Sequence, residues 1–262
     1  MTPRALLKKI LIHFGLLDPA KDLLKKTRLR LESIHKYFQF LLIRDNKERY
    51  LKYFDEFYRD KLSGRNRIYG VKVDRYVGFR KIFEELLNKK TKGFTIIETG
   101  CSRGFNWPDG NSSLLFFEFL NIFGGKLISI DINRENMDTC REILRKEVPK
   151  TGKAKFLTIV GDSVEALNNI NEEADLLYLD SFDFDINDPE PSMRHHLAEL
   201  RSAKNIINKS EDLLLAVDDH FKELNTGKSK YVLEWARNTG QSVLSESHQV
   251  VMKINNNNIY GL

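Results

Sequence analysis

The feature that most constrains the fold is a regular alternation of short apolar runs with stretches of helical periodicity. Five apolar runs follow one another: "FTIIET", "KLISIDI", "KFLTIVGD", "ADLLYLDSF" and "DLLLAVDDHF". Runs of this length between helical stretches are typical of buried parallel strands. We therefore expect an α/β fold, a doubly wound, Rossmann-like and mostly parallel sheet with helices on both faces. Its domain would span residues 78–262, opening on an amphipathic helix over 78–90.

Residues 1–77 are expected to form a basic helical N-terminal segment. By count, residues 1–90 carry 23 Lys/Arg against 11 Asp/Glu, whereas the rest of the chain carries 19 against 26. Such an imbalance favours an anionic partner for the front of the chain, namely lipid headgroups, a nucleic acid or a glycan. The alternative is a solvated helical surface. Residues 45–75, rich in Tyr, Arg and Lys, give no clear pattern.

Two patterns in the N-terminal segment point to possible partners. Leu24, Leu31 and Phe38 repeat at seven residues, with Thr27, Ile34 and Leu41 offset by three. This short heptad seam predicts either a homodimer or docking on the main domain. An earlier amphipathic helix, around Leu6 to Phe14, suits contact with an anionic membrane surface.

The overall composition is that of a globular protein, with 41% hydrophobic and 30% charged residues. No run of 18 apolar residues occurs, so we expect no transmembrane segment. Lysines interrupt the apolar N-terminus, which argues against a signal peptide. The two cysteines fit a reducing compartment, and we expect a cytoplasmic protein, with the membrane periphery as the alternative.

Acidic residues stand at the ends of all five apolar runs. They are Glu98, Asp131, Asp162, Asp180, Asp218 and Asp219. Ligands of open α/β sheets bind at the carboxyl ends of the strands, so these acids are expected to surround one site. The alternative is that each caps a helix or meets solvent.

The first turn has the pattern E-x-G-x-x-x-G, with Glu98, Gly100 and Gly104, instead of the G-x-G-x-x-G of dinucleotide sites. A carboxylate repels a pyrophosphate but suits a ligand that carries an amino group or a cationic centre. S-adenosylmethionine is such a ligand. Asp131 would then accept hydrogen bonds from its ribose hydroxyls, and Asp162 would meet its adenine.

Five motifs in this order resemble the class I S-adenosylmethionine-dependent methyltransferases, over roughly residues 78–254. They are "ETGCSRG", "ISIDIN", "VGDSVEAL", "LYLDSFDFD" and "LLLAVDDHF". The acids after the fourth and fifth strands are similar to those of the macrocin-type (TylF-like) metal-dependent sugar O-methyltransferases and, more distantly, of catechol O-methyltransferase. That resemblance implies Mg²⁺ as a second cofactor, held by Asp180, Asp218 and Asp219 and chelating the substrate's oxygens.

The resemblance also implies the remaining site residues. The cofactor-binding set comprises Glu98, Gly100, Cys101, Ser102, Gly104, Ser113, Asp131, Ile132, Asp162, Ser163 and Asp180. Candidates for the base that takes the acceptor's proton are His195, His196, His220 and Asp183. Lys228 and Lys230 would either hold an anionic substrate or be solvated, and the insert "FNWPDGN" would be a lid or an idle loop.

The function expected from these residues is Mg²⁺-assisted O-methylation of a sugar, a glycan or another polyhydroxylated small molecule. Two alternatives stay open at this point. The basic front of the chain suits a methyltransferase that acts on nucleic acid, although the stacking pattern of single-strand binders is missing. A non-catalytic scaffold that keeps the cofactor pocket is the other alternative.

Overall fold

The computed structural model describes residues 17–259. The chain divides into two compact units, Met1–Leu42 and Ile43–Leu262. The expected N-terminal segment is thereby split, because residues 43–77 belong to the same unit as the sheet. Among the helices of the described residues, none is long and apolar enough to cross a membrane. The helix expected around Leu6 to Phe14 lies outside the described residues.

The described part of the first unit is helix α2, Leu17–Leu42. Four residues of the predicted seam are exposed on it, Leu31, Ile34, Phe38 and Leu41. The side chain of Leu24 is not among those described. Dimerisation through this seam stays a prediction.

A seven-stranded sheet forms the centre of the second unit and confirms the predicted fold class. Its strand order is β10-β11-β7-β6-β3-β4-β5, and only β11 runs antiparallel to its neighbours. In that order the strands are Ser242–Glu246, Val250–Ile254, Leu213–Val217, Leu176–Leu179, Phe94–Thr99, Gly125–Asp131 and Ala154–Val160. The five predicted strands all form, whereas β10 and β11 were not predicted.

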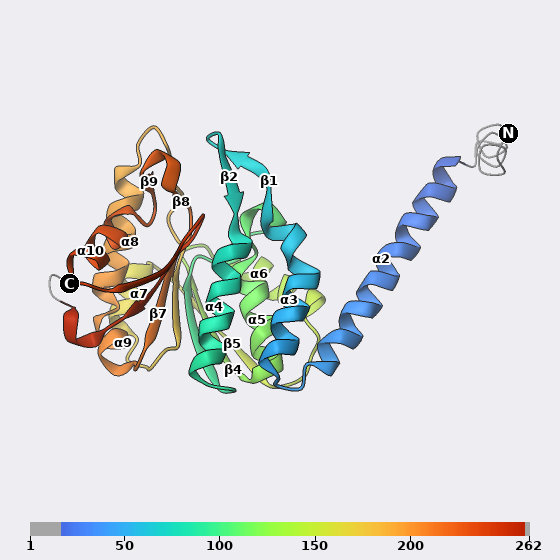
Figure 1. The fold of residues 1–262 in the computed structure, drawn as a ribbon, viewed down its shortest axis with the longest axis horizontal. Helices are drawn as coiled ribbons and strands as arrows, with labels where there is room; N and C mark the ends of the chain where they lie inside the picture. Colours follow the sequence, from blue (N-terminus) through green and yellow to red (C-terminus); the bar gives the residue numbers. More distant parts are fainter. Residues whose placement is uncertain (1–16, 260–262) are drawn as a thin grey trace. The chain divides into compact units, whose positions relative to one another are not determined.

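Helices cover both faces of this sheet, as expected (Figure 1). One face carries α7 (Ser163–Asn169), α8 (Glu190–Ser202), α9 (Lys204–Lys209) and α10 (Lys230–Asn238). The other carries α3 (Lys47–Leu62), α4 (Arg75–Lys89), α5 (Ser112–Phe123) and α6 (Arg134–Glu147). The helix predicted over 78–90 is α4. Burial of the apolar faces of these helices against the sheet is the main stabilising contribution.

Aromatic packing explains why residues 45–75 join the sheet domain. The Tyr50 ring on α3 lies 5.4 Å from Phe83 of α4 and 5.3 Å from Phe119 of α5, centroid to centroid. The hydroxyls of Tyr53 and Tyr58 donate to the buried Glu118 carboxylate at 2.9 and 2.6 Å. A hairpin of β1 (Ser63–Ile68) and β2 (Val71–Asp74) then leads into α4. The aromatic content of this segment therefore serves packing.

Short elements complete the unit. They are the 3-10 turns η1 (Trp107–Asp109), η2 (Lys222–Leu224) and η3 (Asn256–Asn258) and the two-residue strands β8 (His220–Phe221) and β9 (Thr226–Gly227).

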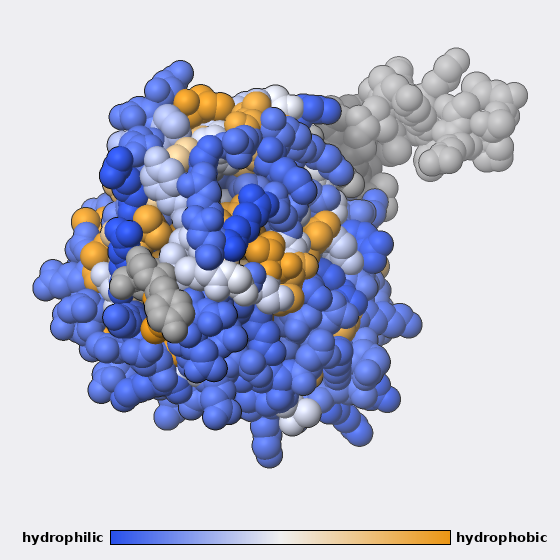
Figure 2. Space-filling model, turned by 60° about the vertical axis from the view of Figure 1, so that its left-hand side comes forward, coloured by the Kyte–Doolittle hydropathy of each residue, from blue (hydrophilic) through white to orange (hydrophobic). Residues whose placement is uncertain are grey.

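The face drawn in Figure 2 is mainly hydrophilic, with its apolar side chains in small separate groups. Exposed apolar groups that are scattered in this way are normal for a protein surface.

Candidate functional site

A cavity of about 430 Å³ opens at the carboxyl ends of strands β3, β4, β5 and β6. Most of the predicted site residues line it: Gly100, Cys101, Ser102, Gly104, Asp131, Ile132, Asp162, Ser163, Asp180, Asp183 and His195. The predicted residues Glu98, Ser113, His196, His220, Asp218 and Asp219 do not line it. The size and the polar lining suit a ligand of small-molecule or cofactor dimensions.

The turn after β3 can be made only with glycine at its first position. Gly100 has φ +76°, a left-handed conformation, and a Cβ there would lie 2.4 Å from the backbone oxygen of Asp180. Its N–H donates to the carbonyl of Ile130 at 2.8 Å. The turn is thus held against both neighbouring strands, and its backbone forms one wall of the cavity.

Asp131 ends β4 with its carboxylate at the cavity. Its Oδ1 accepts hydrogen bonds from the Asn133 backbone N–H at 2.8 Å and from the Asn136 side chain at 3.2 Å. Its Oδ2 accepts a longer one, 3.3 Å, from the N–H of Cys101. The following residue, Ile132, is 76% exposed and also lines the cavity. The fixed Asp131 carboxylate can accept hydrogen bonds from hydroxyl groups, and the exposed Ile132 side chain can pack against a flat apolar ring. The pair therefore suits a ligand that carries both groups side by side.

Unsatisfied polar groups lie where the glycine turn and the start of α5 line the cavity. The Asn111 side chain is 3% exposed, yet neither its nitrogen nor its oxygen has a hydrogen-bond partner among the described residues. The buried hydroxyl oxygen of Ser102 is likewise without a partner there. Both residues line the cavity. Since buried polar groups are rarely left without partners, this part of the cavity is prepared for a polar ligand group.

Sequence reasoning missed Asn111 because it lies in the "FNWPDGN" insert, next to the start of α5. The insert is not idle, since Asp109 as well as Asn111 lines the cavity. Further lining residues that were not predicted are Arg103, Ser112, Ile130, Asn133, Asn136, Gly161, Ser181 and Phe182. Several of them adjoin predicted residues in the chain, so proximity in sequence was the available signal.

Glu98 lies beneath the turn instead of facing the ligand space. Its carboxylate is fully buried and accepts hydrogen bonds from the hydroxyls of Ser112, at 3.1 Å, and Ser129. Burial raises the pKa of Glu98 to about 7, although these hydroxyls act in the opposite direction. The predicted Ser113 is also buried, and its hydroxyl accepts from the N–H of Ser102 at 3.1 Å. Both residues therefore support the turn from below.

Asp162 combines the two roles that the sequence left open for a strand-end acid. Its Oδ1 accepts a hydrogen bond from the Glu165 N–H at 2.9 Å and so caps α7. It also lines the cavity, together with Ser163.

Of the three histidines proposed as a base, only His195 lines the cavity. Its Nε2 lies 3.1 Å from the hydroxyl oxygens of Ser163 and Ser181. The same nitrogen is 3.6 Å from Oε1 of the buried Glu199. The nearby Glu199 carboxylate raises the pKa of His195 above its usual value, and partial burial opposes the rise only in part.

The other two histidines face the protein interior. His196 is fully buried, and its Nδ1 donates to the Ser192 carbonyl at 2.7 Å. Burial lowers the pKa of His196 to about 4, so this ring is neutral at physiological pH. His220 is buried with its Nδ1 2.7 Å from the Ser229 hydroxyl and its Nε2 3.6 Å from Glu246. Neither ring reaches the cavity.

The fourth candidate, Asp183, is exposed at the mouth of the cavity. It forms an ion pair of 3.0 Å with Arg103 from the glycine turn. The aromatic ring of Phe182 is exposed beside it, 5.1 Å from the His195 ring.

The three acids predicted to hold Mg²⁺ are engaged by two buried cations. Arg75 contacts Asp218 at 2.8 Å and Asp219 at 2.7 Å. Lys228 contacts Asp180 at 2.5 Å and Asp219 at 3.1 Å. Lys228 is only 3% exposed, so neither role expected for it, solvation or holding an anionic substrate, describes its position.

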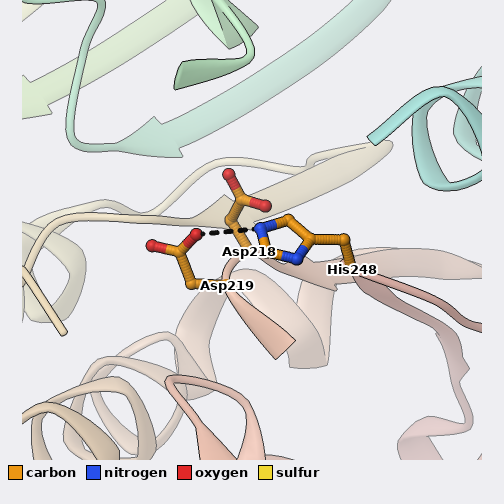
Figure 3. A group of neighbouring side chains, drawn as sticks. All are labelled: Asp218, Asp219 and His248. Carbon is orange, nitrogen blue, oxygen red and sulfur yellow. Dashed lines mark hydrogen bonds and ion pairs between the residues drawn. The ribbon is translucent and has the colours of Figure 1, made fainter. Parts of the chain in front are cut away.

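Figure 3 shows the remaining neighbour of these acids, His248, whose Nε2 lies 3.2 Å from Oδ1 of Asp219. One ligand atom from each of Asp218, Asp219 and His248 lies within 4.8 Å of the others, which is a spacing that a metal ion could use. Arg75, however, already contacts both of these carboxylates, and Lys228 contacts Asp219. A divalent ion would have to displace at least one of two buried positive charges, so the donor set does not fit Mg²⁺ as it stands.

Comparisons with known proteins give no family assignment. No family model matches the chain, and no curated protein matches it. Among solved structures, a methyltransferase from Geobacter sulfurreducens is 13% identical, with a TM-score of 0.45 over 69% of this chain and 78% of that one. The magnesium protoporphyrin IX methyltransferase from Synechocystis PCC 6803 with bound SAM is 12% identical, with a TM-score of 0.40 over 79% and 95%. Human methyltransferase-like protein 13 in complex with SAH is 13% identical, with a TM-score of 0.40 over 65% and 74%. Similarity at this level assigns neither a family nor an activity to the chain.

Proposed function

We propose that the protein is an S-adenosylmethionine-dependent O-methyltransferase that acts on a sugar, a glycan or another polyhydroxylated small molecule. One observation carries this proposal. A single cavity at the carboxyl ends of the parallel strands joins a fixed carboxylate, Asp131, to a group of buried polar atoms without partners around Asn111. The Asp131 carboxylate suits the ribose of the cofactor, and the polar atoms around Asn111 suit its amino-acid end.

The nucleoside would be held at the Asp131 end. The Asp131 carboxylate is anchored by Asn133 and Asn136, so it keeps one orientation in which it accepts hydrogen bonds from ribose hydroxyls. The exposed Ile132 side chain offers an apolar surface to adenine. Asp162 and Ser163 would contribute polar contacts to the ring edge.

The amino-acid end would be held at the glycine turn. The side-chain amide of Asn111 and the hydroxyl of Ser102 can both donate to a carboxylate, and the amide oxygen can accept from an ammonium group. The first turn of α5 begins at Ser112, whose position at a helix N-terminus favours a negative charge nearby. The positive φ of Gly100 lets the backbone approach without a side chain.

When bound, the cofactor supplies a methyl group on a positively charged sulfur. Transfer of that group to an acceptor hydroxyl would release the hydroxyl proton, which a side chain at the cavity would have to take up. His195 is the proposed base, because it is the histidine that lines the cavity. Glu199 holds the ring by its Nε2 side and stabilises the protonated form that results.

The acceptor would enter past the exposed residues at the cavity mouth. Arg103 and Asp183 offer hydrogen bonds to neighbouring hydroxyls, and their 3.0 Å ion pair is exposed enough to exchange with such groups. The Phe182 ring can pack against the apolar face of a sugar ring. This combination of an aromatic face and charged hydrogen-bonding groups supports a polyhydroxylated acceptor.

The buried cations argue against the Mg²⁺ assistance that the sequence resemblance implied. Arg75 and Lys228 neutralise the acids that would bind the ion. We therefore propose that transfer proceeds without a divalent metal.

Calorimetric titration with S-adenosylmethionine tests the cofactor assignment. The variant Asp131→Asn should bind about 10- to 100-fold more weakly, because a hydrogen bond to a charged group contributes about 1.5–3 kcal/mol. The matched control is Asp138→Asn, since Asp138 is an exposed acid on α6 that is paired with Arg141 on the same helix. This control should bind like the wild type. The cofactor assignment would be abandoned if the wild type failed to bind at millimolar ligand.

Radiolabelled methyl transfer to a panel of sugars tests the rest of the proposal. Transfer should survive excess EDTA. Cofactor binding without transfer to any hydroxylated acceptor would favour a non-catalytic scaffold. Transfer to oligonucleotides alone would favour a nucleic-acid enzyme.

A further inference from the structure

We propose that helix α2 binds the surface of a lipid bilayer that contains anionic headgroups. The proposal concerns the first unit of the chain and does not rest on the function assigned to the cavity. It requires α2 to lie in the plane of the interface.

An exposed apolar stripe runs along α2. Leu31, Ile34, Phe38 and Leu41 are 44–61% exposed. At 100° per residue they fall within an arc of about 80° on one side of the helix. Large apolar side chains gathered in this way are costly in water, so the stripe indicates a surface that binds an apolar partner.

The net positive charge of the protein is concentrated in the same unit. Residues 1–42 contain nine Lys/Arg and three Asp/Glu, a net charge of +6. Because the whole chain carries +5, residues 43–262 carry −1. A unit that holds all of the excess positive charge is attracted to an anionic surface, whereas the sheet domain is not.

Basic side chains border the apolar stripe. Arg30 lies about 20° beyond Leu41 around the helix. Arg30 is exposed, and no ion-pair partner for it is found among the described residues. Lys25 is also exposed, but it lies about 160° from the middle of the stripe and adds charge on the opposite side of the helix. Arg28, on the other border of the stripe, is 82% exposed and forms an exposed ion pair with Glu32 on the same helix, a contact of little energetic weight.

This arrangement fits a lipid surface better than the other two candidates. In a coiled coil of two copies, Leu31 and Phe38 would take a positions and Ile34 a d position. Arg28 and Arg30 would then occupy e and g positions. In a parallel pair Arg30 would face His35 of the second copy, so no oppositely charged e/g pair would form there. A nucleic acid would use the charges and leave the apolar stripe in water. An anionic bilayer accepts the stripe among its acyl chains and the arginines among its headgroups.

Vesicle flotation of the full-length protein tests the proposal. The probes are vesicles of phosphatidylcholine alone and vesicles with about one-third phosphatidylserine. Two double variants separate the two contributions, Ile34→Ser/Phe38→Ser for the stripe and Lys25→Glu/Arg30→Glu for the charge. The matched control is Arg145→Glu/Lys155→Glu, which reverses two exposed charges in the second unit.

We expect the wild type and the control to float with the anionic vesicles and not with the neutral ones. Each α2 variant should bind at least tenfold more weakly. Circular dichroism and thermal unfolding show whether each variant keeps the fold. Equal binding to both kinds of vesicle, or wild-type binding by both α2 variants, would overturn the proposal. So would a concentration-dependent dimer in solution that Ile34→Ser/Phe38→Ser abolishes, since that result would assign the stripe to a second copy.

Discussion

Replacement of Lys228 by methionine would test the buried charge cluster beside the cavity directly. Methionine keeps an unbranched side chain of similar length and removes the positive charge. In the wild type, Nζ lies 2.5 Å from Asp180 and 3.1 Å from Asp219, and the side chain is 3% exposed. In the variant Arg75 still contacts Asp218 and Asp219, whereas Asp180 loses its contact with Lys228.

The expected loss of stability follows from the burial of these groups. Removing one partner of a buried ion pair typically costs about 3–5 kcal/mol, because the remaining charge is neither solvated nor paired. For a chain of this size that corresponds to a decrease in Tm of about 6–20 °C. Lys222→Met is the matched control. Lys222 is 62% exposed and 3.7 Å from Glu246, so its loss should cost about 0.5 kcal/mol or less.

The pH dependence of the loss provides a second measurement. Burial already raises the pKa of Asp180, and removal of Lys228 raises it further. A carboxyl group whose pKa is higher in the folded state than in the unfolded state binds more protons when folded, so it destabilises the fold as the pH rises. The difference in stability between Lys228→Met and the wild type should therefore be larger at pH 8 than at pH 5. Urea denaturation at the two values measures it.

Divalent cations provide the decisive comparison. If Lys228 excludes a metal from the acids, Mn²⁺ should raise the Tm of Lys228→Met and leave that of the wild type unchanged. A concentration tenfold above the dissociation constant would restore about 1.4 kcal/mol. The reasoning fails if Lys228→Met is as stable as Lys222→Met. It also fails if Mn²⁺ stabilises the wild type as much as the variant, because the cation would then not block the site.

Three further substitutions address the cavity. Asn111→Gly removes an amide that has no partner among the described residues, at a position whose φ of +48° glycine adopts freely. The free energy of unfolding in urea should therefore change by about 1 kcal/mol or less. Calorimetry should nevertheless show at least tenfold weaker cofactor binding. Gly100→Ala places a Cβ 2.4 Å from the Asp180 carbonyl oxygen, so thermal unfolding should reveal a loss of about 1–3 kcal/mol, together with lost cofactor binding. His195 must be unprotonated to act as a base, and the Glu199 carboxylate raises its pKa above the usual value of 6.5. The methylation rate should therefore increase with pH as this group loses its proton. The pH profile of His195→Gln should lack that increase.

The sheet was predictable because its central strands bury both faces. β6 and β7 are continuous apolar runs, and β3 carries a short one in Ile96 and Ile97; such runs are visible without knowledge of their neighbours. Strands β10 and β11 were missed, as was the way the segment before α4 joins the domain. Tyr50 and Tyr58 in that segment pack against helices more than 20 residues away in the chain, and no local pattern predicts such contacts.

The position of the site was predictable for the same reason, because parallel strands end at one edge of the sheet. The buried cations that pair with the acids could not be predicted from the sequence. Arg75 and Asp218 are 143 residues apart in the chain, and nothing near either residue indicates their ion pair. Lys228 follows Asp219 by only nine residues, but lysines in loops are usually solvated. A carboxylate at a strand end thus predicts where a site lies and not what neutralises the charge.

The insert between the glycine turn and α5 connects the cavity with the charge cluster. Trp107 packs on Tyr58 of α3, with ring centroids 5.4 Å apart, so the insert is anchored at its start. At its end, Gly110 has φ +88°, and a Cβ there would lie 2.8 Å from Cδ of Arg75. The next residue, Asn111, lines the cavity. The backbone that presents Asn111 to the ligand space therefore also packs against the guanidinium side chain that neutralises the acids, so the position of Arg75 depends on the insert as well as on the acids it contacts.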